Sequence, residues 1–420
     1  MKARVIGLLA GCTLIAGLGA ALLLFPGWRS GDDDALRGLI ESGRLTEASE
    51  RAKDLVVARP GAPSAWRWSA TCHRLAGRLE QAAEALDRAL GLERDISDDL
   101  VAERALLRAT GGDLEGTRGF LRAWAASHPD DAWQAELALA KGCLMRFRGQ
   151  QALHHLDRWV EAAPGNPLAL AERGKAKAWL MAYQEAARDL EASLSAGGPA
   201  ERDTRSTLAR CLLETSQPGR AMEYLWPLLE REGAEPGEIR LGVLCSLELG
   251  DQEGAERLLG RLLKIPAGKP DEVARDGLLE ARVEMARGEQ ADWARVESLL
   301  GRVTAQAPGD HEALFLWIRA LRKAGREGEA ARAEERLAKL EAAYARIQRI
   351  QRGEMDKTPL NPALHAEVGA LLESVGNRAE ALGWYRSALA IDPGHAEAAR
   401  GAARLGRAGG SAVPGGPAPK

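Results

Sequence analysis

Aromatic side chains make up only 5% of the 420 residues, and the alternation of Val, Ile and Thr that is typical of strands is nearly absent. No Pro-, Gly- or Ser-rich linker divides the central region, although a compact globule of this length would usually split into two or three domains. The composition therefore favours an all-α chain that grows by adding helical units along one axis.

Motifs that carry chemistry are also missing. The chain has no Cys-x-x-Cys, no Gly-x-Ser-x-Gly elbow, no phosphate-binding Gly-x-x-x-x-Gly-Lys loop and no His-Glu-x-x-His pair. His154 and His155 are adjacent, but neighbouring residues of a helix point about 100° apart and cannot readily chelate one ion. We therefore expect no enzyme activity, no metal site and no cofactor.

Charge of neither sign dominates. The formal net charge is −3, and acidic and basic residues are interleaved along helical stretches such as 332–339. A nucleic-acid-binding protein would carry a concentrated basic stripe with aromatic residues between the charges. Nucleic acid is therefore not expected as a partner.

What the chain does contain is a repeat. An alanine followed four residues later by a leucine recurs at intervals of 34, 35 and 34 residues: Ala152 and Leu156, Ala186 and Leu190, Ala221 and Leu225, Ala255 and Leu259. Apolar residues at this spacing lie on one face of a helix, and a period of this length is typical of helix-turn-helix arrays.

The clearest unit runs from Asn361 to Pro393. Its small residues Gly369, Ala381 and Ala388 would let two helices approach closely, Tyr385 would fill the space between them, and the closing proline would stop the second helix. This spacing resembles the tetratricopeptide repeat (TPR) family. The resemblance implies a right-handed α-solenoid of about ten TPR-like repeats, one of them degenerate (271–308), whose first helices line a concave face that binds proteins.

The amino-terminal segment differs from the rest, because residues 5–28 contain no charged side chain and are long enough to span a bilayer as one transmembrane helix. We expect an uncleaved signal-anchor with a short cytoplasmic amino terminus and extracytoplasmic repeats. The alternative is a cleaved signal and a lipoprotein anchored at Cys12, since Leu9-Ala10-Gly11-Cys12 resembles a lipidation box. The bias toward Arg over Lys, and toward Ala, suggests a bacterium.

These patterns predict the following organisation: a cytoplasmic segment (1–4), a transmembrane helix (5–28), a linker (29–34), a TPR-like solenoid (35–352), a joint (353–360), a carboxy-terminal TPR with a capping helix (361–407) and a disordered tail (408–420).

The cysteines beyond the amino-terminal segment are Cys72, Cys143, Cys211 and Cys245, each in the first helix of a different unit. Equivalent positions on packed helices lie about 8 to 10 Å apart, beyond the reach of a disulfide. We therefore predict buried free thiols.

We predict partner-binding residues on the first helices, at positions off the stripe that packs the two helices of a pair. Cations there could hold acidic segments or carboxy-termini of other proteins, and large apolar side chains could supply contact area. The candidates are Trp68, Arg74, Lys141, Met145, Lys175, Trp179, Arg210, Arg240, Phe315, Arg319 and Arg322. The expected function is a membrane-anchored scaffold for complex assembly, and the alternative is an envelope factor that binds a small ligand such as a carbohydrate or lipid.

Overall fold

A computed structural model describes residues 27–146, 148–197, 202–231, 233–266, 268 and 270–408. Every regular element in these ranges is a helix. Nearly all of the predicted transmembrane helix, the predicted lipidation site and residues 409–420 of the predicted tail lie outside the described residues. Within the described ranges, no helix combines the length and the apolar character needed to cross a membrane.

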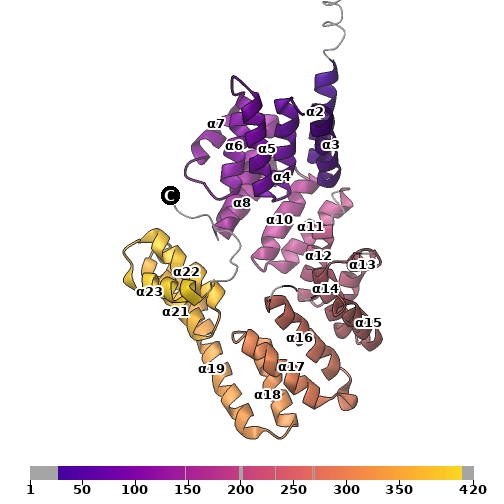
Figure 1. Cartoon of the computed structure of the whole chain (residues 1–420), viewed down its shortest axis with the longest axis vertical. Coiled ribbons are helices and arrows are strands. Elements are labelled where there is room, and N and C mark those ends of the chain that lie inside the picture. The colour runs from indigo at the N-terminus through magenta and orange to yellow at the C-terminus, as the bar shows by residue number, and fades with distance from the viewer. Residues whose placement is uncertain are drawn as a thin grey trace, which may run out of the picture. The chain divides into compact units, whose positions relative to one another are not determined.

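The chain divides into two compact units after Leu228. The first unit is built of helix pairs joined by short turns (Figure 1). The pairs are α2 (Gly27–Glu41) and α3 (Leu45–Ala58), α4 (Pro63–Leu75) and α5 (Leu79–Leu92), α6 (Asp98–Thr110) and α7 (Arg118–Ser127), α8 (Ala132–Met145) and α9 (Gly149–Ala162), α10 (Pro167–Trp179) and α11 (Tyr183–Ser195), α12 (Arg202–Glu214) and α13 (Pro218–Leu229). A short 3₁₀ turn, η1 (Pro129–Asp131), precedes α8.

The second unit continues the same pattern. Its pairs are α14 (Pro236–Glu248) and α15 (Gln252–Leu262), α16 (Pro270–Met285) and α17 (Trp293–Gln306), α18 (His311–Lys323) and α19 (Glu327–Arg349), α21 (Pro362–Ser374) and α22 (Arg378–Ile391), followed by α23 (Ala396–Ala408). Three short helical turns, η2 (Gly288–Gln290), the π-helical η3 (Ile350–Glu354) and α20 (Met355–Lys357), complete it. The described residues thus form ten helix pairs, as the period predicted.

The repeated alanines and leucines form the core of these pairs. The four alanines of the pattern are fully buried, and their leucine partners are at most 7% exposed. In the pair α10 and α11, a Cβ on Gly174 would lie 2.7 Å from Cγ of Leu190 and 3.2 Å from the carbonyl oxygen of Ala186. Small residues therefore permit the close approach of the helices, as the pattern indicates.

Most turns within the pairs end the first helix on a left-handed glycine, as at Gly43, Gly77 and Gly250. In two pairs of the first unit, the structure describes a residue other than glycine at this place. Met181 (φ 60°) and Ser216 (φ 57°) occupy the left-handed position of the turns α10–α11 and α12–α13. A side chain with a Cβ is disfavoured in this conformation, by roughly 1 kcal/mol.

Two predicted connecting segments are helical instead. Residues 29–34 belong to α2, whose Asp32 accepts from Arg51 (2.7 Å) and Arg59 (3.1 Å) and so ties this stretch to the first repeat. The predicted joint (353–360) is largely continued helix, in η3 and α20. Arg346 of α19 bonds to both Glu354 and Glu367, the latter at 2.7 Å, and so links α19 and η3 to α21.

The four cysteines of the described residues are free and buried, which confirms their prediction. Burial raises the pKa of the Cys72 thiol to about 12 and the pKa of the Cys211 and Cys245 thiols to about 11. These thiols are therefore protonated and unreactive at neutral pH.

Candidate functional site

The first helices of the first unit bury the two earliest candidates. Trp68 is 5% exposed, and its Nε1 donates to Asp33 Oδ1 at 2.6 Å. Arg74 is 1% exposed and donates to both carboxylate oxygens of Glu103, at 2.6 and 3.1 Å, and to Gln134 at 2.9 Å. Trp68 and Arg74, both predicted to bind a partner, are therefore buried in this structure and bonded to residues of the chain itself.

Their burial follows from a close approach of non-consecutive first helices. Lys141 of α8 donates to the carbonyl oxygen of Leu75 at the end of α4, at 3.0 Å. At the other end of α8, Asp131 pairs with Arg37 of α2 at 3.2 Å. First helices of the first four repeats are consequently bonded to one another through their own side chains.

The lysines predicted to follow in this unit are neutralised by carboxylates of adjacent first helices. Glu172 of α10 lies 3.5 Å from the ammonium groups of both Lys141 and Lys175, and Lys175 also pairs with Asp203 of α12 at 2.7 Å. Burial by itself would raise the pKa of the Glu172 carboxyl, but the two ammonium groups hold it below its usual value. These lysines therefore join one repeat to the next.

Two candidates of the second unit are paired in the same manner. Arg240 of α14 donates to Asp276 of α16 at 2.6 and 3.2 Å, and these bonds raise the pKa of its guanidinium. Arg322 of α18 pairs with Glu334 of α19. Among the predicted cations, only Arg210 and Arg319 form no ion pair with a carboxylate in the part of the chain that the structure describes.

The large apolar candidates remain exposed. Met145 is 53% exposed, Trp179 46% and Phe315 54%. The first two end α8 and α10 in consecutive repeats of the first unit, whereas Phe315 lies on α18 of the second. The exposed apolar candidates therefore fall in both units, two in the first and one in the second.

The candidate in the second unit belongs to a row along α18. Phe315, Arg319 and Lys323 follow one another at intervals of four residues and so lie on one helix face. The Arg319 guanidinium lies 5.8 Å, and the Lys323 ammonium 5.9 Å, from the ring centroid of Trp293 at the start of α17. We call these four residues the α18 face.

Sequence reasoning missed two members of this face. Lys323 was detectable, since it continues the four-residue spacing from Phe315 and Arg319. Trp293 was not, because it belongs to the degenerate repeat, where no family position marks it, and only the packing of α17 against α18 brings its ring beside the two cations.

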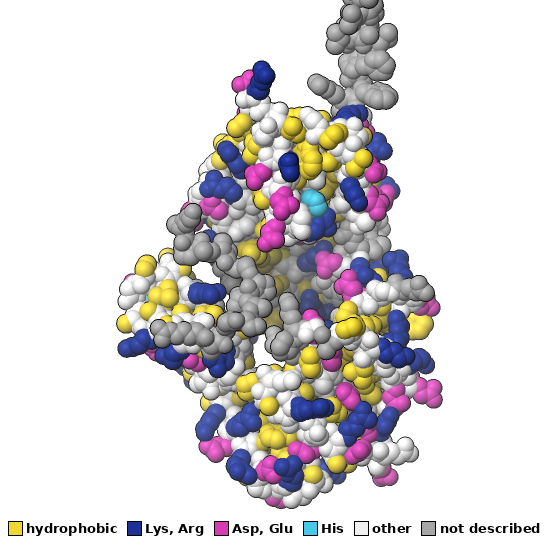
Figure 2. Space-filling model, in the orientation of Figure 1, with side chains coloured by type: hydrophobic (Ala, Val, Ile, Leu, Met, Phe, Trp, Pro, Cys, Tyr) yellow, Lys and Arg dark blue, Asp and Glu magenta, His cyan; other side chains and the backbone are white. Residues whose placement is uncertain are grey.

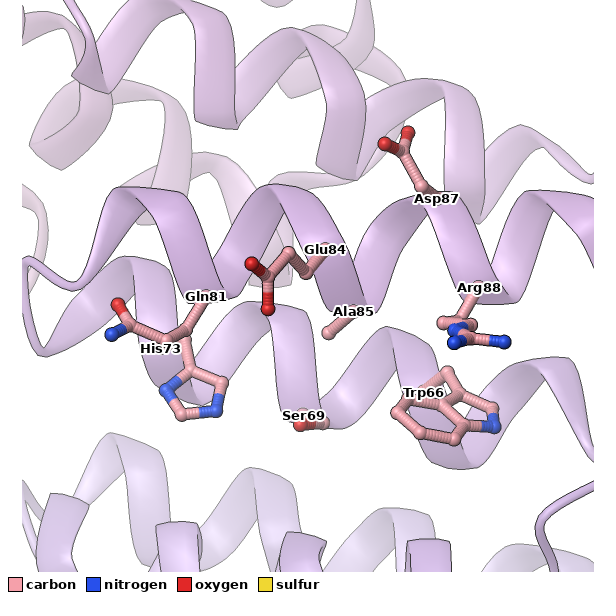
Figure 3. A pocket seen from close by; sticks show the side chains of 8 residues that line it. All are labelled: Trp66, Ser69, His73, Gln81, Glu84, Ala85, Asp87 and Arg88. Carbon is pink, nitrogen blue, oxygen red and sulfur yellow. The ribbon is translucent and has the colours of Figure 1, made fainter.

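The structure also contains a cleft of about 580 Å³ between α4 and α5 (Figure 3). Trp66 stands at one end and His73 with Gln81 at the other, and α5 contributes Glu84, Asp87 and Arg88. Burial and, to a smaller extent, the positive charge of the nearby Arg78 lower the pKa of the His73 imidazole. None of the predicted binding residues lines the cleft, and it has a single aromatic wall, not the aromatic cluster that a carbohydrate or lipid binder would need.

Two further observations bear on other classes of ligand. On the face shown in Figure 2, acidic and basic side chains are interspersed and form no basic stripe. In the described ranges, no group of three or more His, Cys, Asp or Glu side chains could hold a metal ion.

The tetratricopeptide repeat model matches residues 34–99, which span the end of α2 through α5. Together with the ten helix pairs, this match supports the predicted TPR-type fold. No curated protein sequence matches the chain.

Solved structures with a similar helical arrangement include a human IFIT1 dimer with m7Gppp-AAAA (14% identity, 84% of this chain and 94% of that chain, TM-score 0.42). A TPR protein from Parabacteroides merdae (14%, 65% and 98%, TM-score 0.40) and YrrB, described as a TPR protein with an unusual peptide-binding site (19%, 46% and 95%, TM-score 0.37), are also similar.

Proposed function

We propose that the chain is a TPR scaffold that binds partner proteins, and that the α18 face of its second unit takes an acidic segment of one of them. The proposal depends on two exposed cations, Arg319 and Lys323. Both lie near the indole ring of Trp293, and neither forms an ion pair with a described carboxylate. Other inner-helix cations of this unit, such as Arg240, already have acidic partners.

The dimensions of this face suit a short extended peptide. Phe315 and Lys323 are eight residues apart on α18, a rise of about 12 Å. An extended chain covers this length in about four residues at roughly 3.3 Å each. A segment with one apolar residue followed by two or three carboxylates would place its apolar side chain on Phe315 and its charges on Arg319 and Lys323.

A polyanion such as RNA fits less well. Nucleic-acid binding draws most of its affinity from many phosphate contacts, whereas this face offers two cations on a chain with a net charge of −3. A peptide with few carboxylates needs only local complementarity.

The test is fluorescence anisotropy of the full-length protein with a labelled Phe-Gly-Glu-Glu-Glu peptide, beside the same peptide with Gln in place of Glu. We expect binding of the acidic peptide to weaken about tenfold in a variant with Arg319→Gln and Lys323→Gln, and to weaken with salt. Arg302→Gln is the matched control, since Arg302 is an exposed arginine of α17 in the same unit. Equal affinity for the acidic and the Gln peptide would contradict the proposal.

We further propose that residues 5–28 anchor the scaffold in the cytoplasmic membrane of a bacterium, with the repeats outside the cytoplasm. The support is the uncharged, strongly apolar character of this stretch. The chain should then stay with membranes after a carbonate wash, and protease added outside spheroplasts should cleave it. Lipid attachment that is lost in Cys12→Ser would favour the lipoprotein alternative.

No catalysis is part of this proposal. The repeats bring partners together, and the reactions that follow are the partners' own.

A further inference from the structure

The turn between α10 and α11 contains a methionine where a glycine is favoured. Met181 donates its backbone N–H to the carbonyl of Ala178, and Ala182 donates to that of Lys177, at 3.1 and 2.9 Å. This pair of bonds is the Schellman arrangement, which requires a left-handed residue at its centre. Met181 adopts that conformation (φ 60°), although other pairs of the chain use glycine at the same place.

The methionine gains no packing in return for this conformation. Its side chain is 71% exposed, the highest value among the exposed large apolar residues other than Val57. An apolar side chain that is both conformationally disfavoured and in water contributes nothing evident to folding. Backbone strain of this kind is often found at binding surfaces.

Two further exposed apolar residues lie at the same edge. A Cβ on Gly149, the first residue of α9, would lie 2.9 Å from Cζ3 of Trp179 and 2.5 Å from Cδ2 of Leu180. The indole therefore rests on the start of α9, beside the turn that follows Met145 at the end of α8. We call Met145, Trp179 and Met181 the turn-edge patch.

The two chain segments that carry this patch are basic. Neither residues 141–149 nor residues 173–183 contain an Asp or Glu, and Arg146 and Arg148 flank the patch as exposed side chains. Arg146 donates to the carbonyl of Gly112 at 3.0 Å, and Arg148 forms an exposed ion pair with Glu115 at 3.9 Å. The Arg146 guanidinium is therefore held in position by a backbone carbonyl.

We propose that the turn-edge patch is a second interaction surface, separate from the α18 face, and that it binds an amphipathic helix of a partner protein with acidic residues beside its apolar stripe. Met145 and Trp179 end the first helices of consecutive repeats. Residues i and i+7 of such a partner helix are about 10 Å apart, so its apolar stripe would reach from one side chain to the other. Methionine and tryptophan are enriched at protein interfaces, and the arginines complement acidic flanks.

A bilayer surface is the less suitable occupant. Surface binding to lipid rests on a long apolar helix face together with several free cations. The turn-edge patch has three apolar side chains, and one of its two arginines is already bonded to a carbonyl.

The test uses the full-length protein and a labelled 15-residue helical peptide with Leu at positions 1, 4, 5, 8, 11 and 12 and Glu at the flanking positions. Met181→Gly removes the apolar side chain and restores the residue that the turn favours. We expect affinity for the peptide to fall about tenfold while the melting temperature stays equal or rises. If Met181 had only a structural role, its replacement would not lower the affinity for the peptide while leaving the melting temperature equal or higher.

Ser216→Gly is the matched control, because it makes the same backbone change in the next turn of the same unit. It should leave the affinity unchanged. A Lys-flanked version of the peptide should bind at least tenfold more weakly than the Glu-flanked one.

Three outcomes would overturn the proposal: unchanged affinity in Met181→Gly, an equal loss in Ser216→Gly, or no preference for the Glu-flanked peptide. A fourth contradicting outcome is attachment to phosphatidylglycerol vesicles that is tighter than peptide binding and is lost in Met181→Gly. That result would assign the turn-edge patch to a membrane surface. The α18-face variants should not affect this peptide, so the two proposals fail independently.

Discussion

The basic side chains of three first helices in the first unit and those of α18 in the second unit are used differently. In the first unit, Arg74, Lys141 and Lys175 face carboxylates of neighbouring helices and join the repeats. On α18 of the second unit, Arg319 and Lys323 face a tryptophan ring instead. A cation on the inner face is therefore a binding candidate only where the neighbouring helix supplies no acid.

The buried pair of the first unit should give the largest effect on stability. Glu103→Gln leaves the Arg74 guanidinium charged and without its counter-ion in a site that is 1% exposed, and we expect a loss of about 3 to 5 kcal/mol. Urea denaturation followed by circular dichroism measures it. Glu115→Gln, at a carboxylate that is 83% exposed, is the control and should change stability by less than about 0.5 kcal/mol.

The half-buried lysines should give a smaller effect. Lys141→Glu with Lys175→Glu places two new carboxylates beside Glu172 and Asp203, and we expect a loss of about 1 to 2 kcal/mol through repulsion. Arg210→Glu, at an exposed residue, should cost much less. Unchanged stability of the double variant would show that these pairs do not join the repeats.

Acid should weaken the same contacts. The pKa of the Glu172 carboxyl is lower in the folded chain than its ordinary value of 4.5, so its contribution to stability is present above about pH 4.5. That contribution is lost as the pH falls through the lowered pKa that Glu172 has in the folded chain. Stability measured from pH 6 to pH 3 should therefore fall less steeply for Glu172→Gln than for the wild type, whereas Glu115→Gln should not alter the slope.

The α18 face should give the smallest effect on stability. Arg319→Gln with Lys323→Gln removes no ion pair within the described residues, and we expect the free energy of unfolding to change by less than about 0.5 kcal/mol. The same variant should lose binding of the acidic peptide. A large loss of stability instead would place these cations among the structural ones and remove the contrast with the paired cations of the first unit.

The helix pairs were predictable because their signals are local and repeated. The buried alanines and leucines recur at one period, and glycines such as Gly77 and Gly250 end first helices on left-handed residues. The binding residues were only partly predictable. The positions of Trp68 and Arg74 in the TPR pattern predicted an accessible face. In the structure, the approach of α8 to α4 and α2 encloses both side chains.

The sequence by itself determined the helix pairs, the close approaches at small residues and the free cysteines, because each depends on residues within one repeat or on its period. Only the tertiary structure decided which cations are neutralised and which remain exposed. Arg74 and Glu103 are 29 residues apart, and Arg240 and Asp276 are 36 apart. A charge pair is strong only over a few ångströms, so helix packing alone decides which carboxylate meets which cation.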